Sequence, residues 1–460
     1  MRALVLVPDL KKISRAGSDK GEASDRVGGL AHSPQDRLIE TTGLAEAIDL
    51  QVIESQIVPV PNPRPGTLFG SGKVEALGAF VAAHEIALII IDHPLTPIQQ
   101  RNLERAWRAK VLDRTSLILE IFGRRARTRE GRLQVELAHL SYQKSRLVRT
   151  WTHLERQRGG YGFLGGPGEA QIELDRRMID ARITAIRKDL EVVVRTRELH
   201  RKGRRRVPYP VVAIVGYTNA GKSTLFNCIT GADVFAKQQV FATLDPTMRE
   251  VRLKSGRRII LSDTVGFISD LPTTLIAAFR ATLEEVVEAD LILHVRDISH
   301  AETQMQARDV ETVLSGLGID TEPADSHILE VWNKIDLLSP VTRDEARSAA
   351  QWPEARPVLV SATRGEGMDD LLAAIDARLG RNDEILDLII PAHEGRLVNW
   401  LYEEAQVLER EATETGAVRT RVRIAAEKKQ RLLAQVRRAG AELKVLMPVS
   451  ARWGINARVP

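Results

Sequence analysis

One segment near the middle of the chain constrains the fold more than any other. An apolar, β-branched run at 212–215 leads into a Gly-x-x-x-x-Gly-Lys-Ser sequence, and a helical pattern follows directly. In such a unit the glycines let backbone N–H groups turn inward around a phosphate, and the helix adds the positive end of its dipole. The sequence therefore predicts an α/β, P-loop domain that binds a nucleotide. The predicted binding residues are Gly216, Tyr217, Thr218, Asn219, Ala220, Gly221, Lys222, Ser223 and Thr224.

Three side chains of this loop invite a specific assignment. Lys222 can reach the β- and γ-phosphates and is a predicted catalytic residue, and the Ser223 hydroxyl can hold Mg²⁺. Asn219 stands three residues before the lysine, where some G domains use an asparagine to help bind a monovalent cation. A side chain that simply stabilises the loop is the favoured interpretation of Asn219.

A second phosphate-facing element follows a strand pattern at 258–261. It is the sequence Asp263, Thr264, Val265 and Gly266. We expect Asp263 to contact Mg²⁺ through water and the Gly266 amide to meet the γ-phosphate. Both belong to the predicted nucleotide site, with Asp263 as a metal-site residue and Gly266 as a catalytic one.

Between these two elements lies a candidate switch segment, Phe241, Ala242, Thr243, Leu244 and Asp245. In a GTPase a threonine here closes on Mg²⁺ while the γ-phosphate is present, and loss of that contact upon hydrolysis is the usual switch. Thr243 is the predicted metal-binding and catalytic threonine, and Thr247 is the alternative.

Two more elements select the base. Asn333, Lys334, Ile335 and Asp336 follow a strand pattern at 327–332. The Asp336 carboxylate can accept both N–H donors on the Watson–Crick edge of guanine, whereas adenine offers a different pattern, so the element favours GTP over ATP. A further strand pattern precedes the residues expected to contact the guanine carbonyl, Ser361, Ala362 and Thr363. Each motif alone is weak, but all of them in this order predict a GTPase domain.

One expected side chain is missing. Many GTPases place a glutamine directly after the Asp-x-x-Gly element, where it orients the attacking water. Phe267 occupies that position here and cannot form the needed hydrogen bond. We therefore predict that intrinsic hydrolysis is slow and that a partner or a second group supplies the missing stabilisation.

The length and composition indicate the number of domains, the cellular compartment and the kind of partner. The chain has 460 residues, which suggests about three domains. The single cysteine, Cys228, cannot form an internal disulfide, and no run of about 18 apolar residues exists, so a cytoplasmic protein without a membrane span is expected, with a monomer as the simplest state. The net charge is +5, and basic residues cluster at 124–129 and 201–206. Such clusters suit phosphate backbones, although a solvated linker explains 201–206 equally well.

Changes of pattern divide the chain. We predict an N-terminal α/β domain over 1–128 with a mobile insertion at 11–36, a helical hairpin over 129–206, the G domain over 207–380 and a small α+β domain over 385–460. In the first of these, Gly70-Ser71-Gly72-Lys73 superficially resembles a phosphate loop. The first glycine of that motif is replaced by Thr67, so a turn before a helix is favoured over a second nucleotide site.

The hairpin is expected from heptad-like spacing in two segments. Apolar residues alternate three and four apart in both, at Leu133, Leu137, Leu140, Leu147, Trp151 and Leu154 (with Lys144 interrupting) and at Ile179, Ile183, Ile186, Leu190 and Val193. This pattern predicts a coiled coil, and because the glycine-rich segment between the two helices cannot stay helical, they are expected to pair antiparallel. The glycine-rich tip at 158–168 carries Tyr161, Phe163 and Leu164, which we interpret as partner-probing side chains; the alternative is a loop that folds back on the helices.

The chain resembles the HflX family of GTPases. The resemblance is carried by Arg-Ala-Arg-Thr-Arg-Glu-Gly-Arg-Leu-Gln-Val-Glu-Leu at 125–137, by Gly-Gly-Pro-Gly-Glu at 165–169 with Asp-Arg-Arg at 175–177, and by the switch segment at 241–245. It covers the N-terminal domain, the hairpin and the G domain. It implies a GTPase that binds the large (50S) ribosomal subunit, including its rRNA, and acts in ribosome dissociation, rescue or biogenesis.

The resemblance also implies that the hairpin tip approaches the ribosomal active centre and that the ribosome stimulates hydrolysis. A hydrophobic residue at the position of Phe267 is usual in the family. Some members hydrolyse ATP through the N-terminal domain, but the spacing around Lys73 gives no support for that here. Two alternatives stay open: a signalling switch that acts on a protein partner, and ATP-driven RNA remodelling by the N-terminal domain. Binding to RNA would weaken steeply with added salt, and binding to a protein partner need not.

Overall fold

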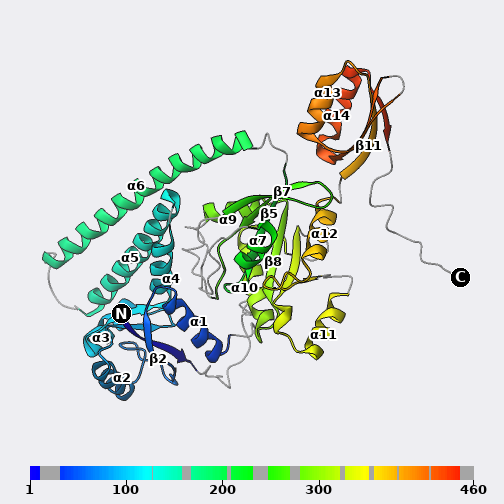
Figure 1. Ribbon diagram of the computed structural model, residues 1–460. Helices are drawn as coiled ribbons and strands as arrows, with labels where there is room; N and C mark the ends of the chain where they lie inside the picture. The colour runs from blue at the N-terminus through cyan, green and yellow to red at the C-terminus, as the bar shows by residue number, and fades with distance from the viewer. Residues whose placement is uncertain are drawn as a thin grey trace, which may run out of the picture.

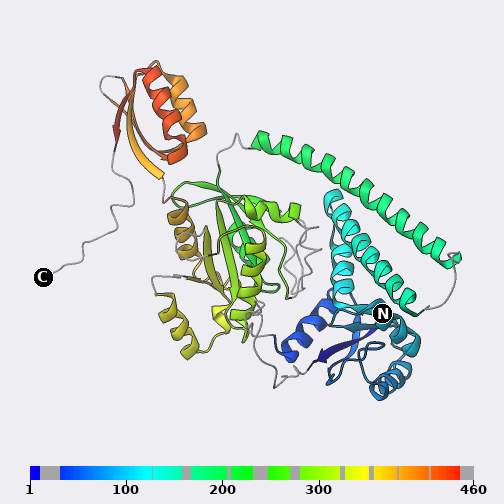
Figure 2. The same cartoon turned by 180° about the vertical axis from the view of Figure 1, so that it is seen from behind.

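The structure is a computed structural model that describes residues 1–10, 32–126, 128–157, 167–204, 209–231, 247–269, 280–321, 327–351, 357–380, 383–413 and 416–445. It shows an α/β protein in which an N-terminal domain and a long helical pair lie beside a central nucleotide-binding-type domain (Figure 1). A C-terminal domain contacts the central domain at the end opposite the N-terminal domain, as the reverse view confirms (Figure 2). The predicted α/β fold class is therefore confirmed.

The N-terminal domain is built on a four-stranded parallel sheet in the order β2-β1-β3-β4. Its strands are β1 (Arg2–Asp9), β2 (Gln51–Pro59), β3 (Leu88–Ile91) and β4 (Lys110–Asp113). Its helices are α1 (Pro34–Glu46), α2 (Ser71–Ala83), α3 (Pro97–Trp107) and α4 (Arg114–Arg125). The run of isoleucines in β3 is buried throughout, as expected for a parallel strand covered on both faces.

The helices begin where the sequence offers capping residues. The side chains of Ser33, Thr96 and Asp113 each accept a hydrogen bond from a first-turn amide. The glycine-rich stretch before α2 behaves differently, because Gly70 is the N-cap and Lys73 already lies in the first helical turn. The prediction of a turn before a helix is confirmed there.

The helical pair consists of α5 (Arg129–Gln157) and α6 (Pro167–Arg204). Ion pairs join Arg182 to Glu136 and Lys144 to Asp180, so the residue numbers run in opposite directions and the helices are antiparallel. The α6 seam is buried at Ile183 and Ile186, as predicted. Residues 158–166, with Tyr161, Phe163 and Leu164 of the expected tip, lie outside the described residues.

The α5 helix differs from the expected simple seam. Its most buried apolar residues are Val135 and Ala138, and they join the core cluster that includes Phe122 of α4. The predicted seam residues Leu133 and Leu137 are only half-buried. The helix therefore divides its apolar surface between α6 and the N-terminal domain, which ties the base of the hairpin to that domain.

The central domain contains a six-stranded sheet in the order β10-β9-β8-β5-β7-β6. Its strands are β5 (Val211–Gly216), β6 (Thr247–Arg252), β7 (Arg258–Asp263), β8 (Leu291–Asp297), β9 (Ile328–Asn333) and β10 (Val358–Leu359). The strands pair in parallel apart from β6, which is antiparallel to β7. The carboxyl ends of β5, β7, β8 and β9 therefore meet at one edge, where ligands bind in open α/β sheets.

Helices cover both faces of this sheet. They are α7 (Lys222–Thr230), α9 (Arg280–Val287), α10 (Thr303–Gly316), α11 (Pro340–Ala350) and α12 (Met368–Leu379), with a short 3-10 helix at Ile335–Leu337. Among the described residues, no helix is both long and apolar enough to cross a membrane.

The C-terminal domain is an antiparallel sheet in the order β12-β13-β11-β14, packed against two helices. Its elements are β11 (Asp383–Ile390), α13 (Gly395–Glu404), β12 (Gln406–Ala412), β13 (Val418–Ala425), α14 (Ala426–Ala439) and β14 (Glu442–Val445). The predicted strand at 418–424 and helix at 426–438 are confirmed. Arg257 of the central domain joins the two domains, since it pairs with Asp376 and Asp383.

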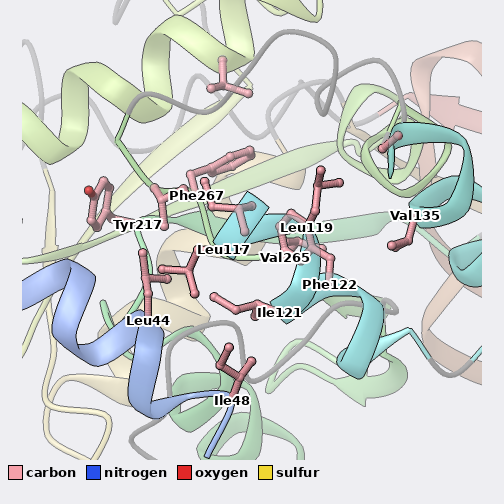
Figure 3. Packing of buried hydrophobic residues seen from close by; sticks show 14 of the residues in the cluster. Leu44, Ile48, Leu117, Leu119, Ile121, Phe122, Val135, Tyr217, Val265 and Phe267 are labelled. Carbon is pink, nitrogen blue, oxygen red and sulfur yellow. The ribbon is translucent and has the colours of Figure 1, made fainter. Parts of the chain in front are cut away.

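A single apolar cluster crosses from the N-terminal domain into the central domain (Figure 3). Leu44 of α1 and Leu117 of α4 come from one side, and Tyr217, Val265 and Phe267 come from the other. The segments that follow β5 and β7 are thus part of the interface between the two domains.

Candidate functional site

The loop between β5 and α7 has the backbone of a phosphate-binding loop. Gly216 and Gly221 have φ values of +152° and +91°. A Cβ at Gly216 would lie 2.2 Å from the Val295 carbonyl oxygen, and one at Gly221 would lie 2.3 Å from Asn333 Nδ2. Asn219 also has a positive φ, +61°, a conformation that asparagine tolerates better than most residues. This geometry favours the loop-stabilising interpretation of Asn219.

Lys222 is the buried cation of this loop. Its side chain is 7% exposed, and Nζ donates a hydrogen bond to the Tyr217 carbonyl oxygen at 2.7 Å. Burial lowers the pKa of Lys222 to about 8, with the neighbouring Lys334 acting in the same direction and Asp263 opposing it. Gly266 lies directly against this amine, because a Cβ there would be 3.0 Å from Nζ. The lysine and the Asp-x-x-Gly element therefore face one another, as a γ-phosphate site requires.

A pair of oxygen donors lies beside the lysine. The Ser223 hydroxyl, in the first turn of α7, donates to Asp263 Oδ2 at 2.8 Å, at the end of β7. Hydroxyl and carboxylate oxygens are the ligands that Mg²⁺ prefers, so this donor set fits a magnesium site. Thr264 does not belong to this pair of oxygen donors. Its hydroxyl donates to the Ile214 carbonyl oxygen at 2.6 Å and so connects the end of β7 to β5.

The candidate base-recognition residues lie together at the ends of β9 and β10. Asn333 donates to the Ala220 carbonyl oxygen at 2.8 Å and accepts from the Ala362 amide at 3.0 Å. It therefore connects the phosphate loop to the Ser361 segment. Asp336 accepts a hydrogen bond of 2.6 Å from the Ser361 hydroxyl, which orients the carboxylate.

The assignment of the switch threonine, Thr243 or Thr247, stays a prediction. The candidate switch residues at 241–245, including Thr243, lie outside the described residues. Thr247, the alternative, is the first residue of β6 and stands opposite Asp263 in the strand register.

Phe267 is packed into the domain interface and is only 2% exposed. Its carbonyl oxygen accepts from the Thr218 amide at 2.7 Å, and its own amide donates to the Gly216 carbonyl oxygen at 3.1 Å. The ring lies among Leu117 and its neighbours (Figure 3). The residue at the position of the usual glutamine is therefore held away from solvent by the N-terminal domain.

Sequence reasoning missed two contributors to the site. Asp297 ends β8 and pairs with Lys334 Nζ at 2.7 Å, which orients the Asn-Lys-x-Asp element. A carboxylate at the end of a buried strand was the available signal. Glu40 of α1 reaches the Tyr217 hydroxyl from the N-terminal domain, and no local pattern marks that contact.

A phosphate loop, an Asp-x-x-Gly element and an Asn-Lys-x-Asp element around one sheet edge define a P-loop G domain. Family models support the same class over most of the chain: "GTP-binding GTPase N-terminal" matches residues 35–123, "GTP-binding GTPase Middle Region" 125–204, "50S ribosome-binding GTPase" 211–334 and "HflX C-terminal domain" 349–444.

Relatives agree with these matches. The GTPase HflX of Magnetococcus marinus is 51% identical over 374 residues, which cover 81% of this chain and 84% of that protein. The GTPase HflX of Caldanaerobacter subterraneus is 43% identical over 87% of this chain and 90% of its own length, and that of Escherichia coli is 45% identical over 79% and 83%. The chain belongs to the HflX family and is a GTPase.

Proposed function

We propose that this GTPase binds the large (50S) ribosomal subunit and acts in ribosome dissociation, rescue or biogenesis, with hydrolysis stimulated by the ribosome. The observation that carries the proposal is the match of residues 211–334 to a family described as a 50S ribosome-binding GTPase, within a chain that belongs throughout to the HflX family. The protein acts as a monomer in the cytoplasm, where ribosomes are found.

The described residues support specific roles in the reaction. Lys222 contacts the β- and γ-phosphates, and Gly266, which lies against its amine, offers an amide to the γ-phosphate. Ser223 would hold Mg²⁺, with Asp263 reaching it through water, and the bound ion would neutralise charge on the phosphate oxygens. Thr243 would complete this metal site while the γ-phosphate is present. The remaining loop amides, from Gly216 to Thr224, surround the phosphates.

Base selection is assigned to the ends of β9 and β10. Asp336 accepts the two N–H donors of guanine, and Ser361 holds its carboxylate in place. Asn333, Lys334 and Ile335, with Ala362 and Thr363, are the other residues assigned to base recognition. Because Asn333 also bonds the Ala220 carbonyl oxygen, base recognition and the phosphate loop are mechanically connected.

The burial of Phe267 supports dependence on a partner. A buried phenyl ring can neither orient a water molecule nor stabilise developing charge. The protein alone therefore turns over slowly, and the missing group comes from the ribosome. The aromatic, glycine-rich segment at 158–168 is the element proposed to reach the ribosomal active centre.

The decisive experiment measures GTP hydrolysis with and without purified large subunits, together with co-sedimentation in the presence of a non-hydrolysable GTP analogue. We expect strong stimulation and analogue-dependent binding that weakens steeply with added salt. Deletion of residues 159–168 should abolish stimulation and spare GTP binding. Absence of both stimulation and co-sedimentation would favour a signalling switch that acts on a protein partner.

A further inference from the structure

The Tyr217 side chain points away from the phosphate loop in which its backbone lies. It is buried in the cluster shared with the N-terminal domain, close to Phe267 and Leu117 (Figure 3). Its hydroxyl accepts a hydrogen bond from the Ser269 amide at 2.8 Å and donates to Glu40 of α1. Burial, together with the adjacent Glu40 carboxylate, raises the pKa of Tyr217, so the phenol stays neutral and remains a donor.

Tyr217 contacts both the lysine of the phosphate loop and the segment that follows the Asp-x-x-Gly element. Its carbonyl oxygen receives the Lys222 amine at 2.7 Å, and its hydroxyl receives the amide of Ser269, three residues beyond Gly266. The backbones on either side are joined as well, through the Phe267 amide and the Thr218 amide. The hydroxyl of Tyr217 and the backbone on either side of this residue therefore join the phosphate loop to the Asp-x-x-Gly segment.

A buried charge network holds this tyrosine from the N-terminal domain. Arg114 of α4 donates to Glu40 Oε2 at 2.6 Å and to Asp92 Oδ1 at 2.7 Å. The same guanidinium donates to the Ser269 hydroxyl at 2.7 Å and carbonyl oxygen at 2.9 Å, and the Ser269 hydroxyl donates to Glu40 at 2.9 Å. Since buried charges are tolerated only with good partners, this network fixes Glu40 and Ser269 in one arrangement.

We propose that Tyr217 is a positioning residue for GTP hydrolysis, held by Glu40 of the N-terminal domain, and that its hydroxyl fixes the spacing between the phosphate loop and the Asp-x-x-Gly segment. The N-terminal domain then contributes to the chemistry of the G site without touching the nucleotide. This inference concerns turnover by the protein alone, so it does not depend on a ribosomal partner. It requires only that hydrolysis takes place between Lys222 and Gly266.

The test compares Tyr217→Phe with Glu40→Gln in steady-state GTP hydrolysis by the full chain. Tyr217→Phe keeps the buried ring and removes only the hydroxyl. We expect kcat to fall about threefold to tenfold, as for loss of one aligned hydrogen bond, while KM and the affinity for a GTP analogue change less than about twofold. Glu40→Gln should lower kcat similarly, and the double variant should be no slower than the slower single one.

Tyr142→Phe is the matched control. Tyr142 is a half-buried tyrosine on α5. Its hydroxyl, like that of Tyr217, donates to a carboxylate, here Asp113, and it accepts from Arg146 rather than from the segment after Gly266. Its kcat should equal that of the wild type, with a similar change in Tm for both tyrosine variants. An unchanged kcat in Tyr217→Phe, an equal loss in Tyr142→Phe, or multiplicative effects of Tyr217→Phe and Glu40→Gln would overturn the proposal. Tyr217→Phe alone decides the matter if Glu40→Gln fails to fold.

Discussion

The N-terminal domain and the G domain contain similar glycine-rich sequences that adopt different backbone conformations. Each is built on a parallel sheet, and each carries a glycine-rich stretch that ends in Gly-Lys. In the N-terminal domain Gly70 has φ −67°, and a Cβ at Gly70 or Gly72 would meet no atom within 4 Å. In the G domain Gly221 has φ +91° and has no room for a Cβ. Glycine is required only in the second setting.

The two lysines differ in the same way. Lys73 is exposed on the first turn of α2 and reaches Gln56 at 3.4 Å. Lys222 is buried, bonded to a loop carbonyl and faces Gly266. A glycine-rich Gly-Lys motif therefore identifies a nucleotide site only when it directly follows a strand and its backbone N–H groups turn inward around the phosphate position.

The largest expected effect separates these lysines. Lys222→Ala should lower kcat/KM for GTP by on the order of 100-fold to 1,000-fold, because it removes a preorganised charge beside the phosphates. Lys73→Ala should leave GTP turnover unchanged. Steady-state GTPase assays on the two variants check this, and equal losses in both would show that the N-terminal stretch takes part in the GTP site.

A smaller effect concerns the choice of base. Asp336→Asn replaces a double acceptor by a group with one acceptor and one donor, so discrimination of GTP against ATP in a competition assay should fall on the order of 100-fold. Any ATP hydrolysis that arises in the N-terminal domain would survive this change. Undiminished preference for GTP would refute the assignment of Asp336.

The glycines give the next contrast. Gly221→Ala forces a Cβ to within 2.3 Å of Asn333 and should weaken binding of a GTP analogue about tenfold or more. Gly72→Ala, in the open first turn of α2, should stabilise the protein by about 0.4–1 kcal/mol in denaturant unfolding, since it restricts the unfolded chain. If Gly72→Ala also weakened analogue binding, the two glycine stretches would not be physically distinct.

Much of this architecture was predictable because it is encoded locally. The phosphate loop, the strands that deliver the G elements and the start of α2 depend on residues within about ten positions of each other. The antiparallel pairing of α5 and α6 also followed from the heptad-like spacing together with the glycine-rich segment between the two helices. The face of α5 that packs on α4 did not, because Val135 and Ala138 are buried by residues whose position depends on the tertiary fold.

The interface around the G site is the part that sequence could not supply. Glu40, Arg114 and Tyr217 are separated by 74 and 103 positions along the chain (114 − 40 and 217 − 114), and nothing near each one indicates its partner. Phe267 illustrates the consequence. A phenylalanine in place of the usual glutamine suggested only that a catalytic side chain is missing. The burial of Phe267 shows that it also forms part of the interdomain core.

The smallest predicted effect tests that interface through pH. His32, just before α1, bonds Asp309 at 2.8 Å and Glu302 at 2.6 Å, both from the α10 region of the G domain. Burial alone would lower the pKa of His32, but the hydrogen bonds and charges of Asp309 and Glu302 outweigh it and raise the pKa to about 9. Asp36 and His300 are further ionisable groups beside this contact.

Because the folded pKa lies above the unfolded value of 6.5, this contact stabilises fully below pH 6.5, and its contribution is lost as the pH rises through about 9. Wild type should therefore exceed His32→Gln in Tm near pH 6.5, with the difference shrinking towards pH 9.5. In contrast to His32, His294 has its pKa lowered to about 4 by burial, so the folded state favours the neutral imidazole of His294. A His32→Gln difference that stays constant from pH 6.5 to 9.5 would mean that shape, rather than charge, joins α1 to the G domain.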